Sequence, residues 1–219
     1  GEFEKDCPTW FKIFTHCGEG LDEAVRANRW CQEFGFTNGR EYLFLWTVSL
    51  LSMPHEPLPY IFFCGDQNTG KSAFHEAISL LFKNGVGYIK ANVALTSPNR
   101  FNAELIQAVL CAVEELNLNP NVGAGKEAYD RIKDWVTSPT LLIHPKGKTP
   151  YHVENTTHWI HCSNNPEACP IFPGDTRIVA CRVGNIPEGK MIPDRKKLMH
   201  LLEAEASIFM YYIFNTTIP

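Results

Sequence analysis

The chain has 219 residues, a formal net charge of −4, 44% hydrophobic residues and 20% charged residues. This length suits one good-sized globular domain with a substantial core. No run of 18 or more apolar residues appears, and no basic segment precedes an apolar stretch at the N-terminus, so the sequence predicts neither a membrane partner nor a secretory signal. We therefore expect a cytoplasmic protein. The mildly acidic charge argues against a broad DNA-coating surface, yet a narrow basic loop remains compatible with it.

Eight cysteines are spread along the chain, and no two of them are spaced as CxxC. Several fall inside apolar runs, which is typical of reduced, buried cysteine in a cytosolic protein. His161, Cys162 and Cys169 match no standard zinc spacing, so a zinc site is not expected there.

The first third of the chain is expected to be helical. Residues 1–20 show no clear pattern, whereas residues 21–34 and 40–51 carry helical periodicity. Three prolines, Pro54, Pro57 and Pro59, then interrupt the chain. We interpret residues 1–56 as a small N-terminal helical segment or collar and residues 57–219 as a second, larger domain.

An α/β fold with a mainly parallel central sheet is predicted for that domain, because apolar runs alternate with helical patterns. Five consecutive apolar residues at 60–64 are typical of a strand buried on both faces, and an amphipathic helix is expected at 73–82. Further elements are expected as an apolar stretch at 86–89, an apolar run at 105–113, a helix at 128–136, hairpin arms at 140–143 and 151–153, strands at 158–162 and 177–183, and a helix at 194–214.

The segment GDQNTGKS, between the strand at 60–64 and the helix at 73–82, satisfies the pattern GxxxxGK[ST] at every defined position. Glycines let such a loop close around phosphate oxygens, and its N–H groups with the following helix N-terminus supply positive potential. Lys71 is expected to reach the β and γ phosphates of ATP, and the Ser72 hydroxyl to bind Mg²⁺. The nucleotide-binding residues predicted in this way are Gly65, Asp66, Gln67, Asn68, Thr69, Gly70, Lys71 and Ser72.

Glu114 and Glu115 follow the apolar run that begins at 105. If this run is a strand of the same sheet, its carboxylates end beside the phosphate loop, where Glu114 would hold Mg²⁺ and Glu115 would polarise the attacking water. The same letters also fit an amphipathic helix with solvated glutamates, and periodicity alone does not separate the two readings. The phosphate loop upstream favours the strand.

Two further polar residues lie at strand ends. Asn164 follows the apolar strand at 158–162, where an amide could contact the γ-phosphate, although a strand and a turn explain the pattern equally well by themselves. Arg177 opens the last strand and could stabilise charge on a transferring phosphoryl group, from a neighbouring subunit in particular. Arg182 is the weaker candidate, because five residues further along a strand it projects to the opposite face.

The order of these motifs resembles superfamily 3 helicases, the AAA+-like motors of small DNA viruses, phages and plasmids, and within them the phage primase-helicase type. The resemblance extends over residues 40–183 and is carried by WTVSLLSMPHEPLPYIFFCGDQNTGKS, SPNRFNAEL and RIKDWVTSPTLLIHPKGKTPYHV. It implies a hexameric ring that hydrolyses ATP between subunits and moves along single-stranded DNA from 3′ to 5′.

The resemblance also implies roles for residues outside the nucleotide site. The hairpin tip would carry Lys146 and Lys148 to the DNA, with His144 as a weaker contact, although a solvated turn also explains its composition. Lys133 would face the ATP site of the neighbouring subunit, as Arg177 would. A primase or polymerase domain or another replication protein is an expected partner, and a phage-encoded chain would act in the host cytoplasm.

Two other functions fit a phosphate loop. A small-molecule phosphotransferase would be a monomer with an arginine-rich lid, and the sequence has no such lid. A nucleotide-binding assembly module that no longer hydrolyses ATP is disfavoured by the intact Lys71, Ser72, Glu114 and Glu115.

Overall fold

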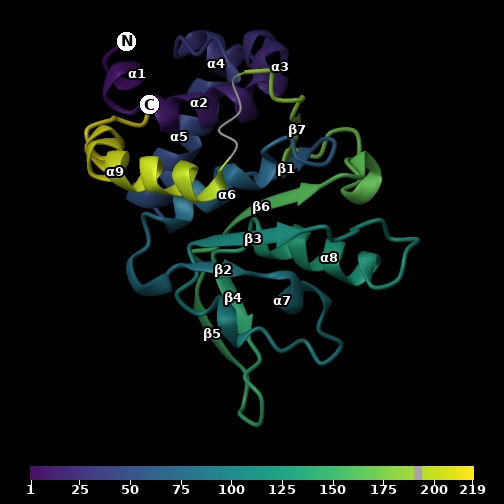
Figure 1. Cartoon of the computed structure of the whole chain (residues 1–219). Helices are drawn as coiled ribbons and strands as arrows, with labels where there is room; N and C mark the ends of the chain where they lie inside the picture. The colour runs from purple at the N-terminus through teal and green to yellow at the C-terminus, as the bar shows by residue number, and fades with distance from the viewer. Residues whose placement is uncertain (190–193) are drawn as a thin grey trace. The chain divides into compact units, whose positions relative to one another are not determined.

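The computed structural model of the chain describes residues 1–189 and 194–219 (Figure 1). The chain divides into two compact units, which are described one at a time. The helical unit comprises Gly1–Ser52, Gly65–Lys83 and Cys181–Pro219, and the sheet unit comprises Met53–Cys64 and Asn84–Ala180. The predicted boundary between residues 56 and 57 stays a prediction.

Five strands form the central sheet, in the spatial order β2-β3-β6-β1-β7. The pairs β2–β3, β3–β6 and β6–β1 are parallel, which confirms an α/β fold with a mainly parallel sheet flanked by helices. The strands are β1 (Tyr60–Cys64), β2 (Tyr88–Lys90), β3 (Leu110–Glu114), β6 (His158–Ser163) and β7 (Ile178–Arg182).

Apolar side chains on both faces explain why these strands lie in the middle of the sheet. All six residues of β6 are buried, as are the first four of β1 and of β3. On one face the strands pack on α8 (Gly125–Trp135), where Trp135 stacks on Trp159 with ring centroids 5.8 Å apart. The other elements of the sheet unit are α7 (Asn92–Thr96), η3 (Ala103–Leu105), η4 (Pro166–Ala168) and the antiparallel hairpin of β4 (Thr140–Ile143) and β5 (Tyr151–Glu154).

Aromatic packing holds the helical unit together. Trp10 stacks on Phe209 at 4.0 Å, and Phe14 lies 4.9 Å from Phe74, so the N-terminal and C-terminal helices share one core with α6. The carboxylate of Glu205 accepts hydrogen bonds from the backbone and hydroxyl of Thr9. The helices are α1 (Glu2–Asp6), α2 (Pro8–Gly18), η1 (Glu19–Leu21), α3 (Asp22–Ala27), α4 (Arg29–Glu33), α5 (Gly39–Ser52), α6 (Lys71–Ser79), η2 (Lys83–Gly85) and α9 (Arg195–Phe214).

The single helix predicted at residues 21–34 is wrong. Asn28 adopts an extended conformation and separates α3 from α4, because its side chain accepts a hydrogen bond from Cys31 N at 3.1 Å and so caps α4. Residues 1–20, for which the sequence showed no clear pattern, form α1 and α2.

Other predicted elements match the structure with small shifts of their ends. α5 and α9 confirm the helices expected at 40–51 and 194–214. All eight cysteines are unpaired, and only Cys64 is more than slightly exposed, which confirms the expectation of buried, reduced cysteine. Within the described part of the chain, no helix is both long and apolar enough to cross a membrane.

Candidate functional site

The predicted phosphate loop leaves the carboxyl end of β1 and enters α6, so the predicted order of strand, loop and helix is confirmed. Two loop residues, Asn68 and Gly70, have left-handed backbones with φ of 62° and 83°. Such residues turn successive N–H groups toward one side, which is how a loop backbone can form an anion-binding concavity. Gly65 has no room for a side chain, because a Cβ there would collide with the carbonyl of Val183.

Lys71 is the buried cation of this loop. Its side chain is only 6% exposed, and its Nζ donates hydrogen bonds to the carbonyls of Gly65 at 3.0 Å and Asp66 at 2.8 Å. A buried ammonium needs such partners to offset the loss of water. The loop backbone therefore holds the charge at the start of α6, where an anionic ligand would be favoured by the helix N-terminus as well.

Helix α2 contacts the outside of the same loop, which the sequence did not reveal. His16 Nε2 donates a hydrogen bond to the carbonyl of Thr69 at 2.7 Å, and the Cys17 thiol contacts the carbonyl of Gly70 at 3.8 Å. A loop that turns its N–H groups inward must find donors for carbonyls that point outward. His16 supplies one of them. No motif surrounds His16, so only the fold could have identified it.

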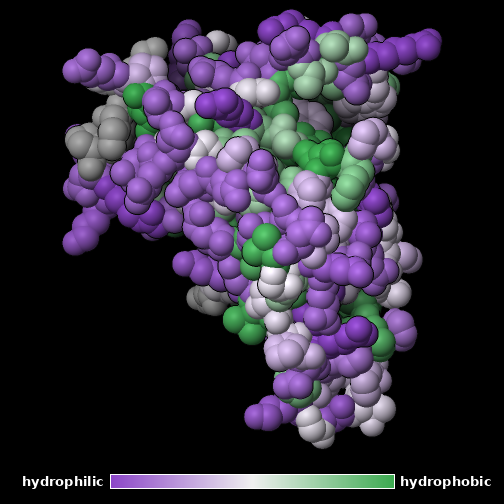
Figure 2. Space-filling view, turned by 90° about the vertical axis from the view of Figure 1, so that its right-hand side faces the viewer, coloured by the Kyte–Doolittle hydropathy of each residue, from purple (hydrophilic) through white to green (hydrophobic). Residues whose placement is uncertain are grey.

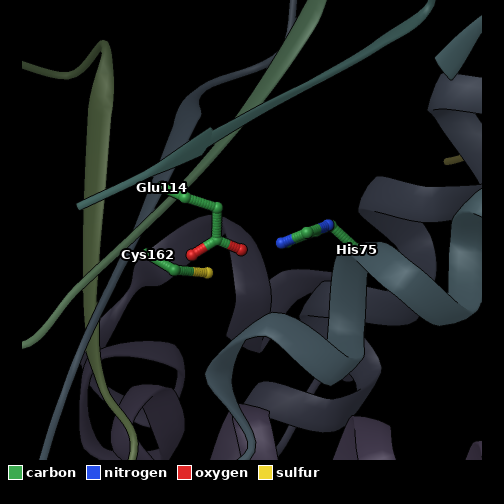
Figure 3. Close-up of side chains that lie close together, drawn as sticks. All are labelled: His75, Glu114 and Cys162. Carbon is green, nitrogen blue, oxygen red and sulfur yellow. The ribbon is translucent and has the colours of Figure 1, made fainter. Parts of the chain in front are cut away.

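Glu114 closes β3 at the carboxyl edge of the sheet, so the predicted strand is confirmed for residues 110–114 and the helical alternative is wrong there, whereas residues 105–109 precede the strand and Leu105 belongs to η3. Asn92 holds the backbone of Glu114 on both sides, with Nδ2 donating to the carbonyl at 2.7 Å and Oδ1 accepting from the N–H at 3.1 Å. Cys162 is its register partner on β6, and Figure 3 shows the two side chains projecting to the same side of the sheet, with His75 of α6 also labelled.

Glu115 is the first residue beyond β3 and has a left-handed backbone with φ of 51°. For a residue with a Cβ this conformation costs about 1 kcal/mol. Its N–H donates to the carbonyl of Cys162 at 2.9 Å, and its Oε2 accepts a hydrogen bond from Asn164 N at 3.4 Å. The predicted water-activating residue and the predicted sensor residue therefore lie together.

Strand β6 lies between β1 and β3, so these three strands end side by side. Ser163 pairs with Cys64, and Cys162 pairs with Glu114. The segments that lead into the predicted phosphate loop, to Glu115 and to Asn164 therefore all begin at one edge of the sheet. Ligands of open α/β sheets bind at this carboxyl edge.

His161 lies in the middle of this strand group as a buried, neutral side chain. Its ring is 4.9 Å from that of Phe62 and 5.9 Å from that of Tyr60, and burial lowers its pKa to about 4. The His161 ring therefore packs against the aromatic side chains of β1.

Each of the two units contains a predicted Mg²⁺ ligand with a hard oxygen donor. Ser72 lies in the first turn of α6 and offers a hydroxyl, and Glu114 offers a half-buried carboxylate. Mg²⁺ prefers such oxygen ligands and keeps several of its waters. The glycines at both ends of the loop leave its backbone open to phosphate oxygens. The loop residues could hold the phosphates of ATP.

Arg177 lies at the opposite, amino-terminal edge of the sheet. Its carbonyl accepts a hydrogen bond from Tyr60 N at 2.7 Å, at the beginning of β1. The five residues of β1 separate it by roughly 15 Å from the end of that strand. Its guanidinium forms a bidentate pair with Asp175, with both N···O distances at 2.8 Å, and this pairing lowers the pKa of the Asp175 carboxyl.

Lys133 and Arg177, the two predicted interface residues, share Tyr129 as a neighbour. Lys133 Nζ lies 4.9 Å from the centroid of the Tyr129 ring and 2.8 Å from Asp130 Oδ1. Burial, followed by the nearby carboxylate of Asp175, raises the pKa of Tyr129, while Arg177 opposes the shift. The structure thus brings these two cations into one cluster, away from the carboxyl edge. Arg131, in contrast, is structural, since its guanidinium donates to three backbone carbonyls.

The predicted nucleic-acid residues lie on the connection between β4 and β5. Lys146 and Lys148 are exposed and His144 is half-buried. Buried Asn102 braces the start of this connection, because its Nδ2 donates to the carbonyl of Leu142 at 3.0 Å and its Oδ1 accepts from His144 N at 2.7 Å. Like the role of His16, the role of Asn102 was not predicted from the sequence, although Asn102 lies in the segment SPNRFNAEL.

Comparison with known proteins assigns this arrangement to a family. The model of a family described as "Family of unknown function (DUF5906)" matches residues 63–177, more than half of the chain. The chain belongs to this DUF5906 family. The matched segment contains every residue predicted above to bind nucleotide, metal or nucleic acid or to lie at an interface, yet the family description assigns none of them a role. No curated protein matches the chain.

Solved structures of another protein have the same fold as this chain. The apo structure of the C-terminal region of NrS-1 superposes with a TM-score of 0.67 over 91% of the chain, at 16% sequence identity. The A form apo structure of the same region superposes with a TM-score of 0.69 over 97% of the chain, also at 16% sequence identity. The chain spans only 46% of the length of that region. At this identity the likeness shows the fold.

Proposed function

We propose that the chain is the ATP-hydrolysing motor of a superfamily 3 type helicase, a single-stranded DNA translocase that serves replication of a phage or mobile element. One observation supports the proposal: Glu114 ends β3, and the predicted phosphate loop, Glu115 and Asn164 each follow a strand that ends at the same edge of the sheet. The 3.4 Å contact between Glu115 and Asn164 supports a joint role for the last two.

Each residue of the proposed site has a separate role in ATP hydrolysis. Lys71 would bind the β and γ phosphates, and Ser72 and Glu114 would hold Mg²⁺, which would supply positive charge for the transferring phosphoryl group. Glu115 accepts a proton from, or orients, the attacking water. Asn164 lies against the Glu115 carboxylate. A shift of Asn164 or of Glu115 on binding or loss of the γ-phosphate would therefore be transmitted to the other residue.

The position of Arg177 supports a ring. Arg177 lies at the amino-terminal edge of its own sheet, opposite the carboxyl edge that carries Glu114 and Glu115, so a catalytic Arg177 must act on the site of another subunit. Arginine supplied in this way stabilises transition-state charge and makes hydrolysis depend on assembly. Lys133 shares its cluster and would face the same neighbour. By analogy with superfamily 3 motors, we propose a hexamer.

DNA binding is proposed for the β4–β5 connection. Lys146 and Lys148 are exposed, and the connection contains no acidic residue that would neutralise them. His144, held by Asn102, contributes a further contact next to the lysines. Phosphate contacts of this kind make binding to a single strand strongly salt-dependent.

The proposal is tested by ATP hydrolysis as a function of protein concentration, with and without single-stranded DNA, for the wild type and Arg177→Ala. We expect specific activity to rise with protein concentration, to be stimulated by DNA and to collapse in the variant. Activity that is constant per subunit, indifferent to DNA and unchanged in Arg177→Ala would refute the motor and favour a monomeric phosphotransferase.

A further inference from the structure

The hairpin that carries the predicted DNA-binding lysines has an exposed aromatic residue where its second strand begins. Tyr151 follows the connection HPKGKTP directly and is 44% exposed, although its cross-strand partner Ile143 is fully buried. Aromatic side chains combine a large apolar face with a polar tip, so an exposed tyrosine beside a charged loop can contact a ligand through its ring. The ring is therefore available to a ligand.

The connection that precedes this ring carries positive charge only. Between Ile143 and Tyr151 the chain contains Lys146, Lys148 and one histidine, and no aspartate or glutamate. Lys146 and Lys148 make no ion pair with any of the described residues. Such a surface complements a polyanion. In Figure 2 the surface at the tip of the hairpin, which Figure 1 locates, is coloured mainly from purple to white.

Backbone pairing and hydrogen bonds hold the hairpin where β5 begins at Tyr151. Four residue pairs connect β4 and β5, and Asn102 fixes the backbone at Leu142 and His144 with two hydrogen bonds. Prolines at 145 and 150 restrict the connection itself. A ring presented from a fixed backbone loses little conformational freedom when it binds a flat partner.

Lys148 and Tyr151 are close enough in the chain for one ligand to contact both the lysines and the tyrosine ring. Tyr151 is three residues from Lys148, and three residues extend over at most about 10 Å. A single strand whose phosphates lie on the lysines thus has bases within reach of the tyrosine ring. Proteins that bind single strands without sequence preference combine a basic groove with aromatic stacking in this way.

We infer that Tyr151 stacks on a base of the single-stranded nucleic acid whose phosphates contact Lys146 and Lys148. This inference rests on the proposed function, and adds that the strand is recognised through its bases as well as its charge. Bases are accessible to such a ring only in a single strand, so a paired duplex is excluded from the same contact.

The test compares Kd values of the full chain for an oligothymidylate and for an abasic oligomer of equal length and charge, measured by fluorescence anisotropy. We expect Tyr151→Ala to weaken binding of the oligothymidylate about 5- to 100-fold and to leave binding of the abasic oligomer unchanged. Tyr151→Phe keeps the ring and should bind both as the wild type does. Tyr211→Ala, which removes an exposed tyrosine on α9, is the matched control and should change neither value.

Two results overturn the inference while leaving DNA binding intact: equal affinity of Tyr151→Ala and wild type for oligothymidylate, or an equal loss on both oligomers, which would indicate damage to the hairpin. A wild-type chain that binds neither oligomer at low salt overturns the proposed function itself, and the inference with it. The double variant Lys146→Ala/Lys148→Ala separates the contributions, since it should weaken both oligomers and flatten the salt dependence.

Discussion

Glu115 and Asn164 join the ends of two adjacent parallel strands, because Oε2 of Glu115 accepts a hydrogen bond from the backbone N–H of Asn164 at 3.4 Å. The contact requires the left-handed backbone of Glu115, which turns the chain at the end of β3 toward β6. Strained residues that persist in a fold are commonly found at functional sites. Here the strained residue is the one proposed to activate water.

Glu115→Gln should bind ATP as the wild type does and hydrolyse it about 10²- to 10⁴-fold more slowly, because the amide cannot accept a proton from water. Nucleotide binding measured by fluorescence and hydrolysis measured by phosphate release separate the two effects. Glu167→Gln removes an exposed carboxylate of the same unit and should change neither. Hydrolysis by Glu115→Gln at the wild-type rate would remove Glu115 from the proposed site.

Lys71→Ala should lose nucleotide binding, with a fall in activity of about 10²-fold or more, because it deletes the buried cation of the phosphate loop. The carbonyls of Gly65 and Asp66 also lose their donor, so thermal unfolding should be followed in parallel. Lys12→Ala, an exposed lysine on α2, is the control. Retention of tight ATP binding by a folded Lys71→Ala protein would contradict the loop assignment.

Mixing two inactive variants tests whether Arg177 acts between subunits. Arg177→Ala keeps an intact phosphate loop and Lys71→Ala keeps an intact Arg177, so a mixture can form complete sites where the two variants meet. We expect hydrolysis in the mixture to exceed that of either variant alone. Arg182→Ala, on an exposed arginine of β7, should retain activity by itself. A mixture as inactive as its components would argue against a shared site.

His16→Ala should raise the KM for ATP about 2- to 10-fold with a smaller change in kcat, since it removes one hydrogen bond that positions the loop carbonyl of Thr69. His16→Gln can still donate from its side-chain amide and should recover much of the affinity. His200→Ala, an exposed histidine of α9, is the control. A purely structural role would lower thermal stability and leave KM unchanged in the surviving protein.

Stability should fall as the pH is lowered from 6.5 toward about 4, because burial lowers the pKa of His161 to about 4 and the unfolded chain binds the proton first. The loss attributable to this residue is at most about 3 kcal/mol. Urea unfolding across this range should show a shallower pH dependence in His161→Leu than in the wild type. His158, whose pKa burial also lowers, contributes in both proteins. Identical slopes would show that His161 does not control this dependence.

Local sequence patterns were sufficient to predict the elements whose conformation depends mainly on residues close together in the chain. Five apolar residues before GDQNTGKS predicted β1, and two glycines with a lysine predicted the loop that enters α6. The hairpin arms and the long C-terminal helix were also found, since alternation and helical periodicity persist through them. Each of these signals depends on near neighbours in the chain, and no tertiary contact is needed to read it.

Tertiary structure alone decided the rest, because the deciding partners are distant in sequence. The run at 105–113 suits a helix or a strand, and pairing of Cys111 with Ile89 and Trp159 settles it as a strand. Likewise, the contact of His16 with Thr69 joins residues far apart in the chain. Arg177 lies at the amino-terminal edge of the sheet because its carbonyl pairs with the backbone N–H of Tyr60, and only the folded sheet shows that it is remote from the carboxyl edge. Local propensity carries no information about such contacts, since their energy exists only once the chain has folded.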